Sequence, residues 1–187
     1  VWENGFRHVT NSRQPIETPA DLAGVKLRTP SGVWRLKLFQ ALGANPTPMA
    51  LSEVFIGLQT GVIDGQENPL WVIEVYKFYE IQKYMTLTRH VYSPHIDVAS
   101  LKWWKTLDAN TQDLIQRTIH EAAVFQRNDN RSKNAARLAL LKEKGMEIEA
   151  HPDIDAFRAK VAGLKDMDLY SEPRIQALLI EMLIATQ

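Results

Sequence analysis

A regular alternation of strand-like and helix-like segments over roughly the first ninety residues constrains the fold more than any other feature. Residues 5–10 ("GFRHVT") and 25–29 ("VKLRT") are typical of strands, and each precedes a segment with helical spacing. Prolines hold "NPTPM" extended, and "VID" at residues 62–64 is expected to be a further short strand. This alternation predicts an α/β fold, with a parallel or mixed sheet flanked by helices and a ligand crevice beyond the strand ends.

Capping residues place the first helices. Thr18 as N-cap, Pro19 at the first position and Gly24 as the stop predict a short helix. Ser31 is expected to cap the segment that begins "GVWRLKLFQ", and Ser52 to cap "EVFIGLQT". Along the sequence, these helices alternate with the predicted strands, as an α/β fold requires.

The second half has a different texture. Residues 111–144 contain neither Gly nor Pro and have helical periodicity, which predicts one long helix of roughly 50 Å. Its middle, "RNDNRSKN", is polar all round, so we expect this helix to bridge two bodies. A short strand at "MEIEA" and helices at residues 154–164 and 172–185 follow.

Composition excludes several classes of partner. The 22 basic and 22 acidic residues give no net charge, so no net field attracts the chain to nucleic acid or an anionic membrane. No apolar run approaches the roughly 20 residues of a membrane-spanning helix, and the absence of cysteine excludes disulfides and thiol chemistry. The opening "VWENGFRH" lacks the pattern of a signal peptide, so we expect a processed chain or a fragment.

Neither a metal site nor an active site is predicted. The five histidines have no metal-ligand spacing, and the pair in "HVYSPHID" is more typical of structural histidines. No phosphate loop, dinucleotide fingerprint or nucleophile elbow is present, so no cofactor is expected. Asp64 and Glu67 could serve as an acid–base pair of a glycosidase, but no other feature near them supports that chemistry.

Three polar residues fall where predicted strands end: Arg7, Arg28 and Asn68. Strand ends converge in an α/β sheet, and two guanidinium groups with an amide can bind a carboxylate through paired hydrogen bonds. In the same interpretation "DGQEN" is a tight loop facing the crevice, and Trp71, about one helical turn further on, covers the ligand. The alternatives are that the arginines cap surface carboxylates and that "DGQEN" is an ordinary turn with Gly65 at positive φ.

Three blocks resemble the substrate-binding proteins of TRAP transporters, the DctP-like family: "GFRHVTNSRQPIETPADLAGVKLRTP", "ALGANPTPMALSEVFIGLQTGVIDGQENP" and "KFYEIQKYMTLTRHVYSP". The resemblance is close over residues 2–130 and looser beyond. It implies a two-lobed periplasmic receptor, not an enzyme, that closes on an organic acid and delivers it to membrane permease subunits. No nucleic acid is implied as a partner.

The resemblance assigns roles to residues. The arginine of the family's "KLRxP" motif, its principal carboxylate clamp, falls on Arg28, the second arginine on Arg7 and the amide of "GQEN" on Asn68. Leu51 occupies a position that is aromatic in some members, so the contact there is apolar but smaller. Glu67, within the "GQEN" block, and Trp71, three residues past Asn68, complete the candidate ligand-binding residues.

The resemblance also divides the chain. Residues 1–93 and 134–187 correspond to the second, ligand-binding α/β lobe of a type II-like binding protein, and 94–133 to an excursion that completes the first lobe. The resemblance implies that the family's first lobe is not part of this sequence, so we expect apolar side chains such as Ile96, Val98, Leu101 and Trp104 to be exposed. The competing hypotheses are a self-associating fragment, such as a homodimer without a ligand, and an enzyme acting on an organic acid.

Overall fold

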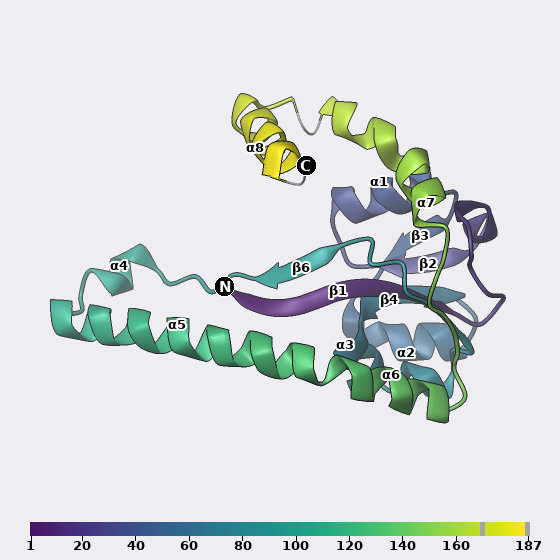
Figure 1. The fold of residues 1–187 in the computed structure, drawn as a ribbon, viewed down its shortest axis with the longest axis horizontal. Helices are drawn as coiled ribbons and strands as arrows, with labels where there is room; N and C mark the ends of the chain where they lie inside the picture. Colours follow the sequence, from purple (N-terminus) through teal and green to yellow (C-terminus); the bar gives the residue numbers. More distant parts are fainter. Residues whose placement is uncertain (169–170, 186–187) are drawn as a thin grey trace.

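The chain folds around one mixed β-sheet, seen in a computed structural model that describes residues 1–168 and 171–185. Within these residues the sheet has seven strands, in the order β3-β2-β4-β1-β5-β7, with β6 paired to the outer part of β1 (Figure 1). In chain order the strands are β1 Trp2–Asn11, β2 Lys26–Thr29, β3 Asn45–Pro48, β4 Gly65–Pro69, β5 Tyr84–Thr86, β6 Tyr92–His95 and β7 Glu147–Glu149.

Strand β1 is the centre of the sheet. It pairs antiparallel with β4, β5 and β6, while β2 runs parallel to β3 and β4, and β5 runs parallel to β7. The register places Arg7 opposite Pro69 on β4, and Arg28 beside Gln66 on the same strand. The C-terminal ends of β2 and β4 thereby lie beside the middle of β1. Arg7 is therefore within a strand and not at a strand end, the position that the sequence indicated, because β1 continues to Asn11.

Helices cover both faces of the sheet (Figure 1). One core packs α2, α3 and α6 against the sheet, and the other packs η1, α1 and α7 against its opposite face. The bounds are η1 Pro19–Leu22, α1 Val33–Ala41, α2 Leu51–Gln59, α3 Leu70–Val75, η2 Phe78–Glu80, α4 Leu101–Trp104, α5 Ala109–Ser132, α6 Asn134–Glu143, α7 Ile154–Val161, η3 Ala162–Asp166 and α8 Pro173–Ala185.

The segment "DGQEN" differs from its prediction. Residues 65–69 are a buried central strand instead of a tight loop, and "VID" is not a strand. Gly65 has no positive φ; it is required because a Cβ there would lie 2.3 Å from the carbonyl oxygen of Thr10 on β1. The polar run is tolerated inside the sheet because its side chains pair with one another and with β1, which period-2 hydrophobicity does not reveal.

Two predicted caps are also displaced. Gly32, not Ser31, precedes α1, and α2 begins at Leu51, one residue before Ser52. Thr18 and Pro19 begin a helix as expected, although it is a four-residue 3-10 helix. The caps are displaced by one residue for α1 and by two for α2, whose N-cap is Ala50, and the predicted helices stay in place.

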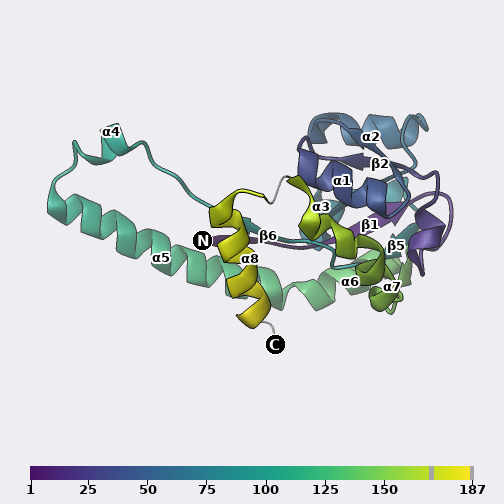
Figure 2. The ribbon, with the colours of Figure 1, turned by 90° about the horizontal axis from the view of Figure 1, so that it is seen from above.

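The long helix is interrupted at Lys133, so α5 and α6 replace the single predicted helix. Its polar middle contacts strand β1: Gln126 exchanges two hydrogen bonds with the backbone of Glu3, and Arg131 and Asn130 bind the Glu3 carboxylate. This segment is polar because its side chains bind the buried carboxylate of Glu3. Figure 2 shows α4 and most of α5 extending well away from the sheet.

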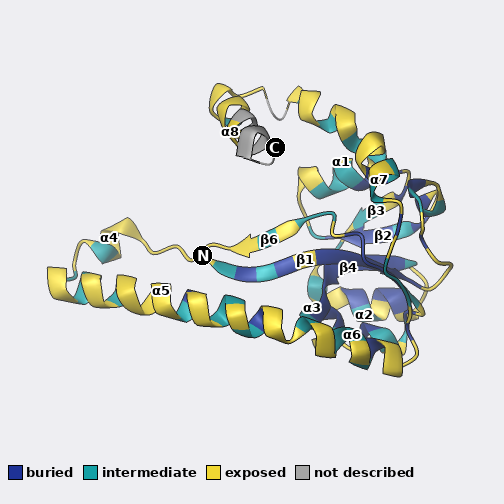
Figure 3. Ribbon diagram, viewed as in Figure 1, coloured by how far each residue is buried: buried dark blue, intermediate teal, exposed yellow. Residues whose placement is uncertain are grey.

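Most residues of the extended part are exposed (Figure 3), and apolar residues are among them, as expected. Val98 is 88% exposed, and Ile96, Leu101 and Phe125 are also well exposed, whereas Trp104 is only partly so. In the part of the chain that the structure describes, no helix is both long and apolar enough to cross a membrane.

Candidate functional site

Five of the six candidate residues line one cavity. It has a volume of about 280 Å³ and lies at the C-terminal ends of β2 and β4, against the middle of β1, beside the first turns of α2 and α3. Its lining consists of Arg7, Arg28, Leu51, Asn68 and Trp71, together with Asn4, Pro30, Val72 and His95. The ends of β2 and β4 therefore converge as the sequence predicted, whereas Arg7 comes from the middle of β1. Of the six candidates, only Glu67 lies outside the lining.

Arg28 is held rigidly at the end of β2. Its Nε and Nη2 donate to the carbonyl oxygen of Met49, at 2.9 and 2.6 Å, while Nη1 has no partner among the described residues. Burial lowers the pKa of Arg28; Glu67 opposes this effect, while Arg7 and Arg35 add to it. A fixed, desolvated cation of this kind favours an anionic ligand that restores the lost hydration.

Arg7 is anchored from behind by Glu67. Arg7 Nε lies 2.5 Å from Glu67 Oε2, and Nη2 donates to Glu67 Oε1 at 2.9 Å and to the Glu67 carbonyl at 2.7 Å. Glu67 itself is fully buried. In this arrangement Glu67 positions Arg7, and Arg7 is the member of the pair that lines the cavity.

Two residues outside the predicted ligand-binding set, His90 and Arg35, complete the Glu67 environment. His90 Nε2 lies 3.0 Å from Glu67 Oε2, its Nδ1 lies 2.7 Å from Thr88 Oγ1, and Arg35 Nε lies 3.6 Å from Glu67 Oε1. Burial alone would raise the pKa of Glu67, but the hydrogen bonds from His90 and Arg7 outweigh it, so the pKa is lowered. Glu67 is therefore a buried carboxylate with cationic and hydrogen-bonding neighbours.

No spacing rule connects Arg35 and His90 with Glu67. Arg35 lies on α1, and His90 lies between β5 and β6, so only the tertiary fold brings them together. The sequence favours structural histidines in "HVYSPHID", and the contacts of His90 with Thr88 and Glu67 agree with that interpretation.

Asn68 is fixed by its neighbours on β4 and β1. Its Oδ1 accepts a hydrogen bond from Arg7 Nη2 at 2.9 Å, and its Nδ2 donates to Gln66 Oε1 at 2.6 Å. Gln66 in turn donates to Thr10 Oγ1. The amide is thus oriented before any ligand arrives, which reduces the entropy lost on binding.

Trp71 and Leu51 form the apolar side of the cavity. Trp71 Nε1 donates to the carbonyl and side-chain oxygens of Asn4, at 2.9 and 3.1 Å, which fixes the indole ring beside the arginines. Leu51 is the first residue of α2. Two arginines and an amide thus face an apolar wall, an arrangement suited to an acid with a non-ionic body.

The arrangement does not support hydrolysis or metal binding. Asp64, the other half of the imagined glycosidase pair, accepts a hydrogen bond from the backbone of Lys26 and pairs with Arg13. Glu67 is enclosed by Arg7 and His90. Across residues 1–168 and 171–185, no three His, Asp or Glu side chains are grouped as metal ligands.

Comparison with known proteins agrees with this geometry. Residues 1–168 match the family model DctP, "Bacterial extracellular solute-binding protein, family 7". The 2,3-diketo-L-gulonate-binding periplasmic protein YiaO of Escherichia coli (strain K12) is 38% identical over 174 residues, which are 92% of this chain and 53% of that protein. The chain therefore spans about half the length of this curated relative.

Solved structures agree in fold. The TRAP periplasmic solute-binding protein of Polaromonas sp. JS666, bound to D-erythronate, is 38% identical with a TM-score of 0.88, over 94% of this chain and 59% of that one. The Chromohalobacter salexigens protein with bound D-glucuronate is 30% identical with a TM-score of 0.92, over 96% and 60%. The family and these relatives are solute-binding proteins and not enzymes, and the chain belongs to this DctP family of bacterial extracellular solute-binding proteins.

Proposed function

We propose that the chain is the carboxylate-binding part of a TRAP-type solute receptor, and that its ligand is a sugar acid. The observation that carries this proposal is the shared cavity of Arg28, Arg7 and Asn68, with Arg28 buried and fixed by Met49. Relatives with bound D-erythronate and D-glucuronate, and one named for 2,3-diketo-L-gulonate, support the class of ligand.

Each residue has a distinct role in this proposal. Arg28 forms two parallel hydrogen bonds with the ligand carboxylate, which a lysine cannot reproduce because its ammonium group is a single point of charge. Arg7 and Asn68 bind the second carboxylate oxygen or a neighbouring hydroxyl. Leu51 and Trp71 limit the size of the body of the acid. Glu67 acts through Arg7, holding its guanidinium group in place.

The division into lobes extends the proposal. Residues 1–93 and 134–187 form the ligand-binding lobe, and 94–133 reach the other lobe of the receptor. Closure of the two lobes buries the acid. The arginines pair with its carboxylate and so offset the free-energy cost of removing that charge from water. In this scheme the receptor works in the periplasm and delivers the acid to permease subunits in the membrane.

Thermal unfolding with erythronate, glucuronate and 2,3-diketogulonate tests the proposal. A ligand that binds the folded state at about 100 times its Kd stabilises it by about 2.7 kcal/mol and raises the midpoint. Arg28→Lys should weaken binding at least about tenfold, because the bidentate geometry is lost. Arg13→Lys is the matched control, since Arg13 is half-exposed and pairs with Asp64 outside the cavity.

Two results would contradict the proposal. An acid that shifts the midpoint equally with and without Arg28→Lys would exclude Arg28 as the clamp. The absence of any shift with the three acids would show that this chain does not bind an acid by itself.

A second candidate function rests on the exposed apolar side chains of residues 94–133. Ile96, Val98, Leu101 and Phe125 all lie on the extended part, and a surface of this kind favours association of two copies. In this alternative the chain is a self-associating interaction module that needs no ligand.

A further inference from the structure

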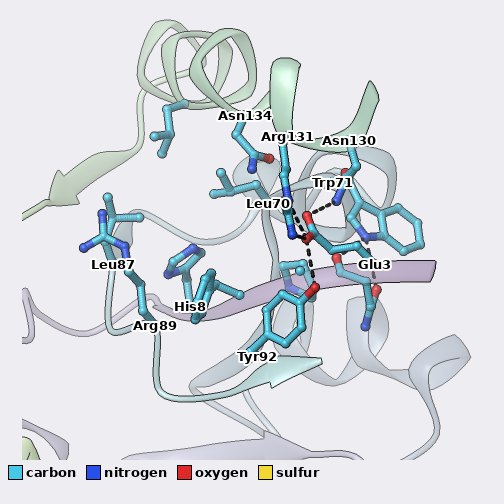
Figure 4. A pocket seen from close by; sticks show the side chains of 15 residues that line it. Glu3, His8, Leu70, Trp71, Leu87, Arg89, Tyr92, Asn130, Arg131 and Asn134 are labelled. Atoms are coloured by element: carbon cyan, nitrogen blue, oxygen red, sulfur yellow. Dashed lines mark hydrogen bonds and ion pairs between the residues drawn. The ribbon is translucent and has the colours of Figure 1, made fainter. Parts of the chain in front are cut away.

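A second cavity, of about 340 Å³, lies beside the carboxylate site (Figure 4). It is lined by β1, the end of β4 and the start of α3, the segment after β5 with the first residue of β6, and the junction of α5 with α6. Asn4 and Trp71 line both cavities, so these two residues form the wall between them. The volume is sufficient for a small organic molecule.

The acid in this cavity is already satisfied. Glu3 Oε2 accepts hydrogen bonds from Arg131 Nε at 2.7 Å and from the Tyr92 hydroxyl at 2.9 Å, and Asn130 Nδ2 lies 3.3 Å from Oε1. Burial alone would raise the pKa of Glu3, but these partners outweigh it and lower the pKa. Glu3 and Arg131 therefore neutralise each other, and neither is left to attract a ligand.

His8 is the buried group without a partner. Its side chain is 5% exposed and makes no hydrogen bond within the described residues, and its Nδ1 is sealed from solvent. Burial, with the nearby charges of His90 and Arg89, lowers the pKa of His8 to about 3, so the ring is neutral at physiological pH. An unpaired acceptor costs less than an unpaired N–H, which puts the proton on Nε2 and makes that nitrogen the donor for a molecule in the cavity.

Arg89 supplies the unbalanced charge. It has no hydrogen-bond or ion-pair partner in the part of the chain that the structure describes, and its backbone is left-handed with φ 45°. Such a conformation is costly for a side chain larger than glycine and tends to persist at functional sites. In the view of Figure 4, His8 lies between Arg89 and the Glu3–Arg131–Tyr92 cluster.

We propose that this cavity is a second ligand site, for a small monocarboxylate with an apolar body. Arg89 and His8 Nε2 donate to the carboxylate. The rest of the lining is largely apolar and holds the body of the molecule: Phe6, Pro69, Leu70, Leu87 and Leu138, with the ring of Tyr92. Occupancy would act on Trp71 and Asn4, which face the carboxylate site on their other side.

Arg89 also lines a neighbouring cavity of about 410 Å³ with Arg158 on α7. His8 does not line that cavity, so a change in the resonances of the His8 ring distinguishes binding in the 340 Å³ cavity from binding in the 410 Å³ one. Arg158→Gln is therefore the matched control for a substitution of Arg89.

Benzoate is the probe, and the 15N resonances of the His8 imidazole are the readout in the 187-residue chain. Benzoate should move these resonances saturably, with the free ring protonated on Nε2. Benzyl alcohol, which keeps the apolar body without the charge, should not. Arg89→Asn introduces a residue that tolerates the left-handed backbone, and it should weaken benzoate binding about tenfold. Arg158→Gln should leave benzoate binding unchanged.

Arg28→Lys separates this site from the carboxylate clamp. Benzoate binding detected at His8 should be the same in Arg28→Lys as in the parent chain; its loss there would place the probe in the first cavity and overturn the second site. The inference is also overturned if the His8 resonances do not move at benzoate concentrations on the order of 10 mM, or if Arg89→Asn binds as tightly as the parent.

Discussion

Arg7 and Glu67 form an ion pair inside the sheet, with Arg7 Nε 2.5 Å from Glu67 Oε2 and neither side chain more than 4% exposed. The pair joins β1 to β4, because Arg7 and Glu67 lie on neighbouring antiparallel strands. A buried pair of this kind gains little over apolar packing, yet removing one partner leaves an uncompensated charge. The pair therefore contributes little net stability over apolar packing, and its main effect is to fix the guanidinium group of Arg7, which lines the cavity.

Glu67→Gln should destabilise the fold strongly. Arg7 would lose its counter-charge in a buried position, and Arg35 would lose the same carboxylate at 3.6 Å. We expect a loss of about 3–5 kcal/mol in the free energy of unfolding, measured by urea titration. Asp113→Asn, which breaks the exposed Arg117 pair on α5, is the control and should cost below about 1 kcal/mol. Equal losses for the two variants would show that the Glu67 pair is not desolvated.

The pKa of His8 predicts a loss of stability in mild acid. The folded chain keeps His8 neutral down to about pH 3, whereas the unfolded chain binds a proton below about 6.5. The unfolded state therefore binds more protons in this window, and stability falls as pH falls. Between about pH 6.5 and 5 the loss is about 2 kcal/mol, at about 1.4 kcal/mol per pH unit.

His8→Gln isolates this effect. Glu67, whose pKa is lowered from 4.5, loses its contribution only below that value, so measurements above about pH 5 avoid it. Urea unfolding at about pH 7 and about pH 5 should show a smaller pH-dependent change in His8→Gln than in the parent chain, by about 2 kcal/mol. The same change in both chains would mean that His8 is protonated in the folded state.

Sequence periodicity predicted the α/β fold class, because the alternation of strand-like and helix-like segments is a local feature. Arg7, Arg28 and Asn68 do line one cavity, but Arg7 lies in the middle of β1, and the order of the strands in the sheet does not follow from periodicity. Periodicity failed at "DGQEN", where a polar run normally indicates a loop. Inside this sheet the run is satisfied by cross-strand partners on β1, such as Arg7 for Glu67 and Thr10 for Gln66. Such pairing is tertiary and has no signature in one segment.

The same limit explains what was missed around the site. Arg35 and His90 belong to segments that precede and follow Glu67 by many residues, and each contacts the carboxylate only after the sheet and α1 have packed. The break at Lys133 also had no local signal, since neither Gly nor Pro is near. The sequence shows that the residues beside Lys133 are polar, but their contacts with Glu3 depend on the tertiary fold.

Gly65→Ala should disrupt the centre of the sheet. A Cβ at this position would lie 2.3 Å from the carbonyl oxygen of Thr10 and 2.9 Å from Asn11 Cβ, so two central strands must separate. We expect a loss of about 3 kcal/mol or more by urea unfolding. Gly163→Ala is the control, because nothing lies within 4 Å and its φ is not positive; it should change stability by less than about 1 kcal/mol. Equal effects would contradict the close contact of β1 and β4.

The exposed apolar side chains of residues 94–133 predict self-association. Phe125 is 72% exposed on α5, and Ile96, Val98 and Leu101 are exposed on the segment that leads from β6 into α4. Two copies that bury these side chains together would remove apolar area worth about 25 cal/mol per Å² from water. Sedimentation at micromolar concentration should therefore show a dimer or larger species.

The double variant Val98→Ser with Phe125→Ser should shift this equilibrium to monomer without lowering the unfolding midpoint, since both side chains are exposed in the single chain. Val62→Ser and Val75→Ser, at exposed positions on the sheet body, are matched controls and should leave association unchanged. A parent chain that sediments as a monomer throughout would refute self-association and leave the exposed surface free for another lobe. Association that persists in the double variant would place the contact elsewhere on the chain.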